Sequence, residues 1–199
     1  MIKAILFDLG GVLINQPHTK MFAYIAAHLK IPKTSIEEIY KVYFDIFQKG
    51  TITEAVLWKK ICKELHSEMP QSHSLWEDAF KAAYVERKEM FNLAQKLCTQ
   101  GYKIGLISNT ERPAIRSFRT RYTTFFDITV FSCDVGCAKP EPKIYSIALE
   151  RLQEKPSATI FIDDNPAFVH AADKFGMQGI LFTRFEDVQQ KIEFLVAKP

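Results

Sequence analysis

Apolar and polar positions follow two different patterns along the chain. A short apolar run near the N-terminus ends in Asp8, which is typical of a buried strand of a parallel sheet. From residue 90 onward, similar runs alternate with segments of helical spacing. We expect further strands over 103–108, 126–131, 158–163 and 179–182, and helices over 90–99, 142–152, 167–175, 185–196 and from about residue 112. This alternation predicts an α/β fold built on a doubly wound parallel sheet.

Residues 16–89 have the other pattern, in which apolar side chains recur at helical spacing. Four amphipathic helices are expected, over 17–29, 35–47, 53–65 and 74–85. Joined by short links, they predict a small bundle, and their stripes of Trp and Phe are more typical of a bundle core than of a cofactor site. Because the first strand belongs with the later ones, we expect a core domain over 1–15 and 90–199 and an inserted helical domain over 16–89.

Composition narrows the class of protein. The 199 residues are 47% hydrophobic and 25% charged, as in ordinary globular proteins. The net charge of +3 is too small to indicate a nucleic-acid partner, and no apolar run approaches the roughly 18 residues that a membrane span needs. Lys3 and Asp8 interrupt the N-terminal apolar run, so we expect no signal peptide. The four cysteines match no zinc-binding spacing. We therefore expect a cytoplasmic protein with reduced thiols and no membrane or nucleic-acid partner, in an oligomeric state that the sequence does not indicate.

Polar side chains follow four of the expected strands. The carboxyl ends of parallel strands lie at one edge of a sheet, where ligands of open α/β sheets bind, so we expect these side chains to converge. The glycines that follow the first strand allow a tight turn and a close approach of the backbone to a ligand. The residues concerned are Asp8, Gly10 and Gly11 after the first strand, Ser108 and Asn109 after the second, Lys139 in the loop after the third, and Asp163 and Asp164 after the fourth.

Each of these groups also has a simple structural interpretation. An Asp followed by glycine is common in turns, Ser108 suits a helix cap, and Lys139 suits a solvated loop. The Asp163–Asp164 pair is harder to explain in this way, because adjacent carboxylates after a buried strand repel each other unless a cation lies between them. Taken together, the four groups favour a functional site.

The residue types at this edge indicate phosphate chemistry. Three carboxylates with backbone carbonyls and water make a hard oxygen site suited to Mg²⁺. Asp8 can act as a nucleophile that forms an aspartyl-phosphate. Ser108 and nearby backbone N–H groups can hold phosphate oxygens, and Lys139 can neutralise charge on the nucleophile and on the transferring group.

The motifs Asp-Leu-Gly-Gly-Val-Leu at 8–13, Ser-Asn at 108–109, Lys-Pro at 139–140 and Asp-Asp at 163–164 resemble, in order and spacing, the haloacid dehalogenase-like hydrolase superfamily. The resemblance covers essentially the whole chain, and the helical insert resembles that family's type-one cap. The sequence looks most like its small bacterial sugar-phosphate phosphatases, which include an α-D-glucose-1-phosphate phosphatase. The resemblance implies a Mg²⁺-dependent phosphatase of small phosphorylated metabolites.

The resemblance also assigns roles to individual residues. Asp8 and Lys139 are the catalytic residues it implies, with Asp8 as nucleophile and Lys139 as the charge clamp. Ser108, Asn109 and Lys139 are implied to contact phosphate. The implied magnesium ligands are Asp8, the Gly10 carbonyl, Asp163, directly or through water, and Asp164.

Two positions depart from the family pattern. Gly10 stands where the family usually has a second Asp, the general acid and base, whose help is typically worth about 10²–10⁴-fold. The leaving groups of sugar-1-phosphates and acyl phosphates depart more easily than those of primary alkyl phosphates, so hydrolysis of these substrates loses less rate without the second Asp. The glucose-phosphatase-like branch itself has Gly at this position. Phe168 stands where the family often has Asp or Asn, and losing such an outer partner commonly weakens a metal site about 10–100-fold. Asn165 is a candidate to compensate.

The sequence offers further candidate residues and two alternative functions. Asn15, Gln16, His18 and Arg112 are expected near the mouth of the site, where the insert would close and exclude water, and His18 is a candidate for the missing acid. One alternative is a phosphate-binding or regulatory protein with little turnover. A carbon–halogen hydrolase is another, but that chemistry needs no metal and leaves the Asp163–Asp164 pair unexplained.

Overall fold

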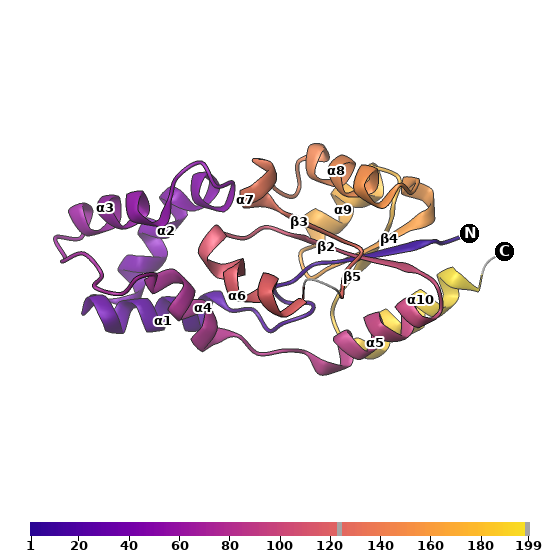
Figure 1. Ribbon diagram of the computed structural model, residues 1–199, viewed down its shortest axis with the longest axis horizontal. Coiled ribbons are helices and arrows are strands. Elements are labelled where there is room, and N and C mark those ends of the chain that lie inside the picture. The colour runs from indigo at the N-terminus through magenta and orange to yellow at the C-terminus, as the bar shows by residue number, and fades with distance from the viewer. Residues whose placement is uncertain (123–124, 198–199) are drawn as a thin grey trace.

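A five-stranded parallel sheet forms the centre of the larger part of the molecule (Figure 1). The computed structural model describes residues 1–122 and 125–197. Every neighbouring pair of strands is parallel, so the predicted α/β fold with a doubly wound parallel sheet is confirmed. The strand order is β3-β2-β1-β4-β5, with β1 Ala4–Phe7, β2 Lys103–Ser108, β3 Ile128–Phe131, β4 Thr159–Asp163 and β5 Gln178–Leu181.

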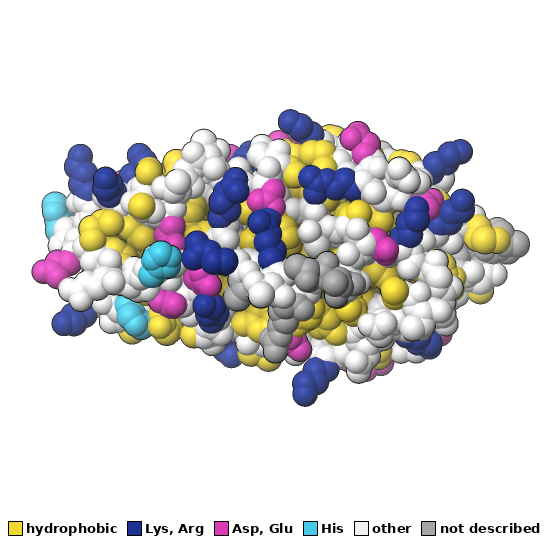
Figure 2. Space-filling view, viewed as in Figure 1, with side chains coloured by type: hydrophobic (Ala, Val, Ile, Leu, Met, Phe, Trp, Pro, Cys, Tyr) yellow, Lys and Arg dark blue, Asp and Glu magenta, His cyan; other side chains and the backbone are white. Residues whose placement is uncertain are grey.

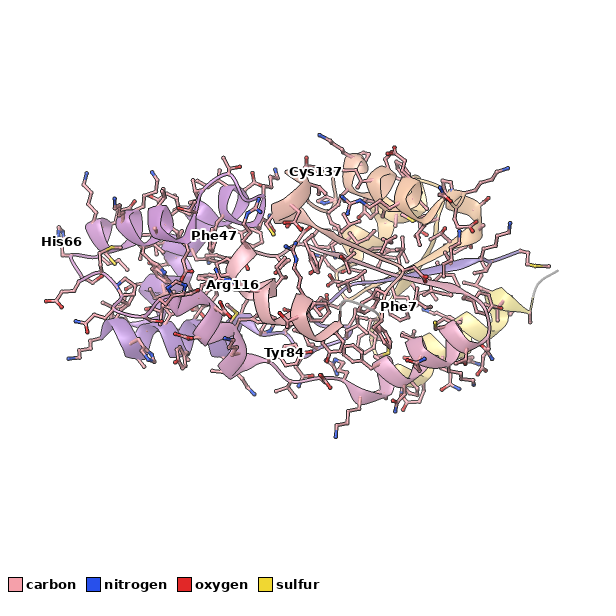
Figure 3. All side chains as sticks on the ribbon, in the orientation of Figure 1. Phe7, Phe47, His66, Tyr84, Arg116 and Cys137 are labelled. Atoms are coloured by element: carbon pink, nitrogen blue, oxygen red, sulfur yellow. The ribbon has the colours of Figure 1, made fainter. Side chains whose placement is uncertain are left out.

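Helices cover both faces of this sheet, and the side chains of β1 point alternately into the two cores between the sheet and these helices. Ala4 and Leu6 belong to the core shared with α8 and α9, whereas Ile5 and Phe7 belong to the core shared with α5 and α10. Phe7 lies within the layered part of the molecule in Figure 3. The helices of this part are α5 (Lys88–Thr99), α6 (Arg112–Tyr122), α7 (Ser132–Val135), α8 (Pro142–Leu152), α9 (Pro166–Lys174) and α10 (Phe185–Val196), with a 3₁₀ turn η1 (Pro156–Ala158).

Four helices between β1 and α5 form a bundle at one end of the molecule (Figure 1). The bundle closes around Trp76, which is fully buried. The rings of Phe22, Tyr40, Phe47 and Trp58 surround it, with centroids between 5.1 and 6.5 Å away. The aromatic stripes are therefore core, as expected. The four helices are α1 (His18–Leu29), α2 (Lys33–Gln48), α3 (Glu54–Glu64) and α4 (Leu75–Ala83).

The elements lie close to where the apolar pattern predicts them, with a few differences. The helix expected over 74–85 ends at Ala83, and the strand expected from 126 begins at Ile128. The short helix α7 was not expected, because four residues are too few to show a helical period. The helix that begins at Arg112 reaches Tyr122, and residues 123–124 lie outside the described residues.

Three global expectations concern thiols, membranes and surface charge. Each of the four cysteines is a free thiol. Within the described ranges, no helix combines the length and apolar character that a bilayer span needs. On the face shown in Figure 2, Lys and Arg side chains are dispersed and interspersed with Asp and Glu.

Candidate active site

The ends of β1, β2 and β4 bring the predicted residues together at one edge of the sheet. Asp8 follows β1 directly, and its backbone N–H donates to the carbonyl of Ile162 on β4 at 2.9 Å. Ser108 ends β2 and Asp163 ends β4, on either side of β1. The central strand therefore places Asp8 between the other two groups.

Lys139 is buried among these groups and is not a solvated loop lysine. Its side chain is 1% exposed. The Nζ atom donates to Asp8 Oδ1 at 2.7 Å and to Asp163 Oδ2 at 2.6 Å, and to the Ile107 carbonyl at 3.3 Å. Phe168 covers it from another side, with the ring centroid 5.1 Å from Nζ. Phe168 therefore contacts the ammonium of Lys139, in the position where the family pattern has a polar residue.

Asn109 fixes the backbone that carries Lys139. Its Oδ1 accepts from the Lys139 backbone N–H, and its Nδ2 donates to the Lys139 carbonyl, both at 2.8 Å. This pair of bonds ties the end of β2 to the loop after α7. The amide of Asn109 is thus engaged with protein backbone at both ends, so the phosphate contact expected of this residue would come from its backbone N–H.

Burial and mutual attraction shift the ionisation of this cluster. The pKa of Asp8 is raised from 3.8 to about 7: burial raises it most, Lys139 acts in the opposite direction, and the charge of Asp163 also raises it. Burial likewise raises the pKa of Asp163. Burial alone would lower the pKa of Lys139, but attraction to Asp8 and Asp163 outweighs it, and the pKa lies above its ordinary value. Lys139 is therefore a cation shared between two carboxylates.

Oxygen atoms gather beside this cluster in a way that suits a divalent cation. One carboxylate oxygen each from Asp8, Asp163 and Asp164 lie within 4.8 Å of one another. The side-chain amide of Gln16 donates to Asp164 Oδ2 at 2.9 Å and to the Gly10 carbonyl at 3.3 Å. A partly positive N–H group thus lies between two oxygens that the sequence predicts as metal ligands. Such a set of hard oxygen donors fits Mg²⁺.

Asp163 differs from the other two carboxylates because both of its oxygens already accept hydrogen bonds. Oδ2 accepts from Lys139, and Oδ1 accepts from the Asn165 backbone N–H at 2.8 Å. Its side chain is fully buried. The side chain of Asn165 caps α9 by accepting from the Ala167 N–H at 2.9 Å. Asp8, Asp164 and the Gly10 carbonyl are therefore the donors best placed for direct contact with a cation.

The two glycines after Asp8 have different roles in this arrangement. Gly11 has a φ of +91°, and a Cβ placed on it would lie 2.0 Å from Asp164 Oδ2. A Cβ on Gly10 would come no closer than 3.6 Å, to Pro17 Cδ. Only glycine at position 11 lets the loop after β1 approach Asp164 this closely.

A cavity of about 510 Å³ lies over the strand ends, between the sheet and the bundle. Of the residues expected at its mouth, Gln16 and His18 line it, and His18 stacks on Phe22 at 5.8 Å. Asn15 is exposed and does not line it, and Arg112 instead donates to the Cys133 carbonyl at 2.7 Å. The bundle contributes His18, Met21, Phe44 and Phe80 to its lining, and the sheet edge contributes Asp8, Gly10, Ser108, Asn109, Glu111, Lys139, Asp164 and Phe168, among others.

Glu111 lines the same cavity, and the sequence did not single it out. It is 3% exposed and lies three residues beyond the end of β2. Its Oε1 accepts from the Tyr40 hydroxyl of α2, and its Oε2 accepts from Trp76 Nε1 of α4 at 3.2 Å. Its position shortly after the end of a predicted strand is the sequence feature that could have identified it.

A larger hollow of about 670 Å³ lies between α4 and α6, lined by Glu77 and Arg116 among others. It contains none of the strand-end residues. The smaller cavity, which is lined by Asp8, Asp164 and Lys139, is therefore the candidate active site.

A family model described as haloacid dehalogenase-like hydrolase matches residues 2–176. The chain belongs to this family. A solved magnesium complex of the HAD family enzyme bt-2542 from Bacteroides thetaiotaomicron is 26% identical, with a TM-score of 0.81 over 96% of this chain and 98% of that one. This agreement over nearly both full lengths confirms the family resemblance.

Curated relatives of the HAD-like chain include phosphatases and larger proteins. The phosphorylated carbohydrates phosphatase of Thermotoga maritima is 24% identical over 90% of this chain and 84% of its own length. Bifunctional epoxide hydrolase 2 of Mus musculus is 25% identical over 96% of this chain but only 38% of its own length. The chain thus spans about two fifths of that larger relative.

Proposed function

We propose that this HAD-like hydrolase is a Mg²⁺-dependent phosphatase of small phosphorylated metabolites, with sugar phosphates favoured. The observation that carries the proposal is the buried bridge of Lys139 between Asp8 and Asp163, with the oxygens of Asp164 and Gly10 beside it. The phosphatase among its relatives supports the same class of reaction.

In this proposal Asp8 is the nucleophile. Its Oδ1 accepts from Lys139, which leaves Oδ2 to attack phosphorus; the bond between phosphorus and the leaving oxygen breaks as the aspartyl-phosphate forms. Lys139 orients Asp8 and offsets negative charge on the transferring group. Ser108 and the backbone N–H groups that follow it hold phosphate oxygens, and water then hydrolyses the acyl phosphate. A bound Mg²⁺, held by Asp8, Asp164 and the Gly10 carbonyl with Asp163 behind them, supplies charge that offsets repulsion between Asp8 and the phosphate.

The leaving group shapes the choice of substrate in this proposal. Gly10 has no side chain to protonate the departing oxygen. Substrates whose leaving group departs without such help are therefore favoured, and sugar-1-phosphates and acyl phosphates are of this kind. Residues 16–89 act as the cap, whose inner face contributes His18, Met21, Phe44 and Phe80 to the cavity. The cap excludes water and contacts the part of the substrate beyond phosphate.

The test is phosphate release from para-nitrophenyl phosphate and from a panel of phosphorylated metabolites, with Mg²⁺ and with a chelator. We expect turnover only with Mg²⁺, and a loss of more than about 10³-fold in Asp8→Asn. Acid-quenched wild-type protein should carry one phosphoryl group on Asp8 by mass spectrometry. The matched control is Asp187→Asn, the same change at a half-buried carboxylate of α10 that pairs with Arg184 and does not line the cavity.

Full activity in Asp8→Asn would exclude the covalent mechanism. A second candidate function, binding of phosphate with little turnover, is favoured by the missing side chain at Gly10 and by Phe168 beside Lys139. Thermal stabilisation by phosphate without hydrolysis of any substrate in the panel would support it over the phosphatase.

A further inference from the structure

Glu111 is a buried acidic group that the proposed chemistry does not use. It lies at the junction of three segments, because its two hydrogen-bond donors come from α2 and α4 of the bundle and its backbone follows β2. It shares the lining of the cavity with Asp8 and Lys139. Glu111 therefore lies on the side of the cavity where the bundle meets the sheet.

The hydrogen bonds of Glu111 satisfy only part of its capacity and do not neutralise its charge. An ionised carboxylate offers about four acceptor positions, and two are taken by Tyr40 and Trp76. Both donors are neutral: burial and the charge of Glu111 raise the pKa of Tyr40 well above its ordinary value, so its hydroxyl keeps its proton. The remaining acceptor positions are available to a hydroxyl group in the cavity.

No Lys or Arg among the described residues that line the cavity is free to pair with a second acidic group on the substrate. Among its described lining residues, Lys139 is the one Lys or Arg side chain, and it already pairs with Asp8 and Asp163. The lining also includes Asp164 and Glu111. A neutral, hydroxyl-bearing leaving group meets acceptors here, whereas an anionic one meets the like charge of Glu111 with no free Lys or Arg to offset it.

We propose that Glu111 is a specificity-determining residue that selects phosphate esters with a neutral, hydroxyl-rich leaving group and rejects those with a second acidic group. This inference rests on the proposed phosphatase function and deepens it. It assigns the discrimination to one carboxylate at the junction of the sheet and the bundle, separate from the groups that handle phosphate.

The experiment compares two substrates that differ only at one carbon. α-D-Glucose 1-phosphate carries a hydroxymethyl group where α-D-glucuronic acid 1-phosphate carries a carboxylate, and the phosphate and its leaving oxygen are the same. We expect wild-type kcat/KM to favour the neutral sugar by about tenfold or more. Glu111→Gln should bring this ratio close to one, because the charge is removed. Glu111→Asp should retain the preference, because the charge is kept.

Glu77→Gln is the matched control, since it makes the same change at another buried carboxylate between the bundle and the sheet. Glu77 of α4 pairs with Arg116 of α6 at 2.7 Å and lines the larger hollow, outside the catalytic cavity. Figure 3 shows Arg116 where α6 faces the bundle. We expect the wild-type ratio in this variant, with folding of all variants checked by thermal melts.

Several results would overturn the inference. Equal wild-type kcat/KM for the two sugars would do so without any variant, and so would an equal change of the ratio in Glu111→Gln and Glu77→Gln. Should Glu111→Gln fail to fold, loss of the preference in Glu111→Asp still overturns the inference, because the charge is kept in that variant. Hydrolysis of para-nitrophenyl phosphate without hydrolysis of either sugar phosphate overturns the inference but not the proposed function. Failure to hydrolyse any phosphate ester overturns the proposed function and the inference with it.

Discussion

At the scale of single residues, the site depends on the absence of a side chain at one position. The carboxylate of Asp164 occupies the space where a Cβ on Gly11 would lie, 2.0 Å from its Oδ2. The backbone at Gly11 is also left-handed, with a φ of +91°, which costs other residues about 1 kcal/mol or more. Any larger residue therefore displaces Asp164 or the loop after β1.

We predict that Gly11→Ala lowers the melting temperature and abolishes the rise in melting temperature that Mg²⁺ gives to wild-type protein, because Asp164 can no longer lie beside the Gly10 carbonyl. Gly10→Ala is the matched control, since its Cβ would be 3.6 Å from the nearest atom. Melts with Mg²⁺ and with a chelator measure both effects. A full Mg²⁺ response in Gly11→Ala would contradict this account of the loop.

The strand-end residues were predictable because each follows a short apolar run, a signal local to the sequence. Lys139 was predictable only in outline, since its burial depends on Asp8, which is 131 residues away in the chain. Glu111 was not predictable, because its partners Tyr40 and Trp76 lie 71 and 35 residues away on other helices. The contact of the Gln16 amide with Asp164 was not predictable for the same reason, because the two residues are 148 positions apart in the chain.

At the scale of elements, the short helix α7 joins the sheet to the bundle. Ser132 is fully buried; its hydroxyl donates to the Gln48 carbonyl at the end of α2 at 2.6 Å and accepts from the Thr110 N–H at 2.9 Å. Close by, a Cβ on Gly50 would lie 2.3 Å from the Cys133 carbonyl, so the chain after α2 packs directly on α7. The apolar pattern predicts the long helices, but this four-residue helix is fixed by tertiary contacts that the pattern does not contain.

We predict that Ser132→Ala lowers the free energy of unfolding by about 1–3 kcal/mol, because it leaves the Gln48 carbonyl and the Thr110 N–H buried without their partner. Ser146→Ala, which removes a surface serine hydroxyl that bonds Glu150 on α8, should change it by less than about 0.5 kcal/mol. Chemical denaturation of the two variants and wild-type protein gives the comparison. Equal losses in both variants would show that α7 is not a specific anchor for the bundle.

At the scale of the whole molecule, the buried charge cluster links folding to pH and to metal. The pKa of Asp8 is about 7 in the folded chain, against an ordinary value of 3.8. Between these two values the folded chain holds a proton that the unfolded chain has released. The contribution of Asp8 to the free energy of unfolding therefore falls as pH rises from about 4 to 7 and is constant above that. Lys139, whose pKa is raised above 10.5, stays protonated in both states across this range.

We therefore predict that, with a chelator present, the melting temperature of wild-type protein falls more steeply between pH 5 and pH 7 than that of Asp8→Asn, which has no proton to release at this position. Mg²⁺ should raise the wild-type melting temperature more at pH 8 than at pH 5, because protons compete with the cation for the carboxylates. Thermal melts across buffers of constant ionic strength measure both slopes. Parallel pH profiles for the two proteins would mean that Asp8 ionises as an ordinary carboxylate, and they would contradict the raised pKa that burial gives it.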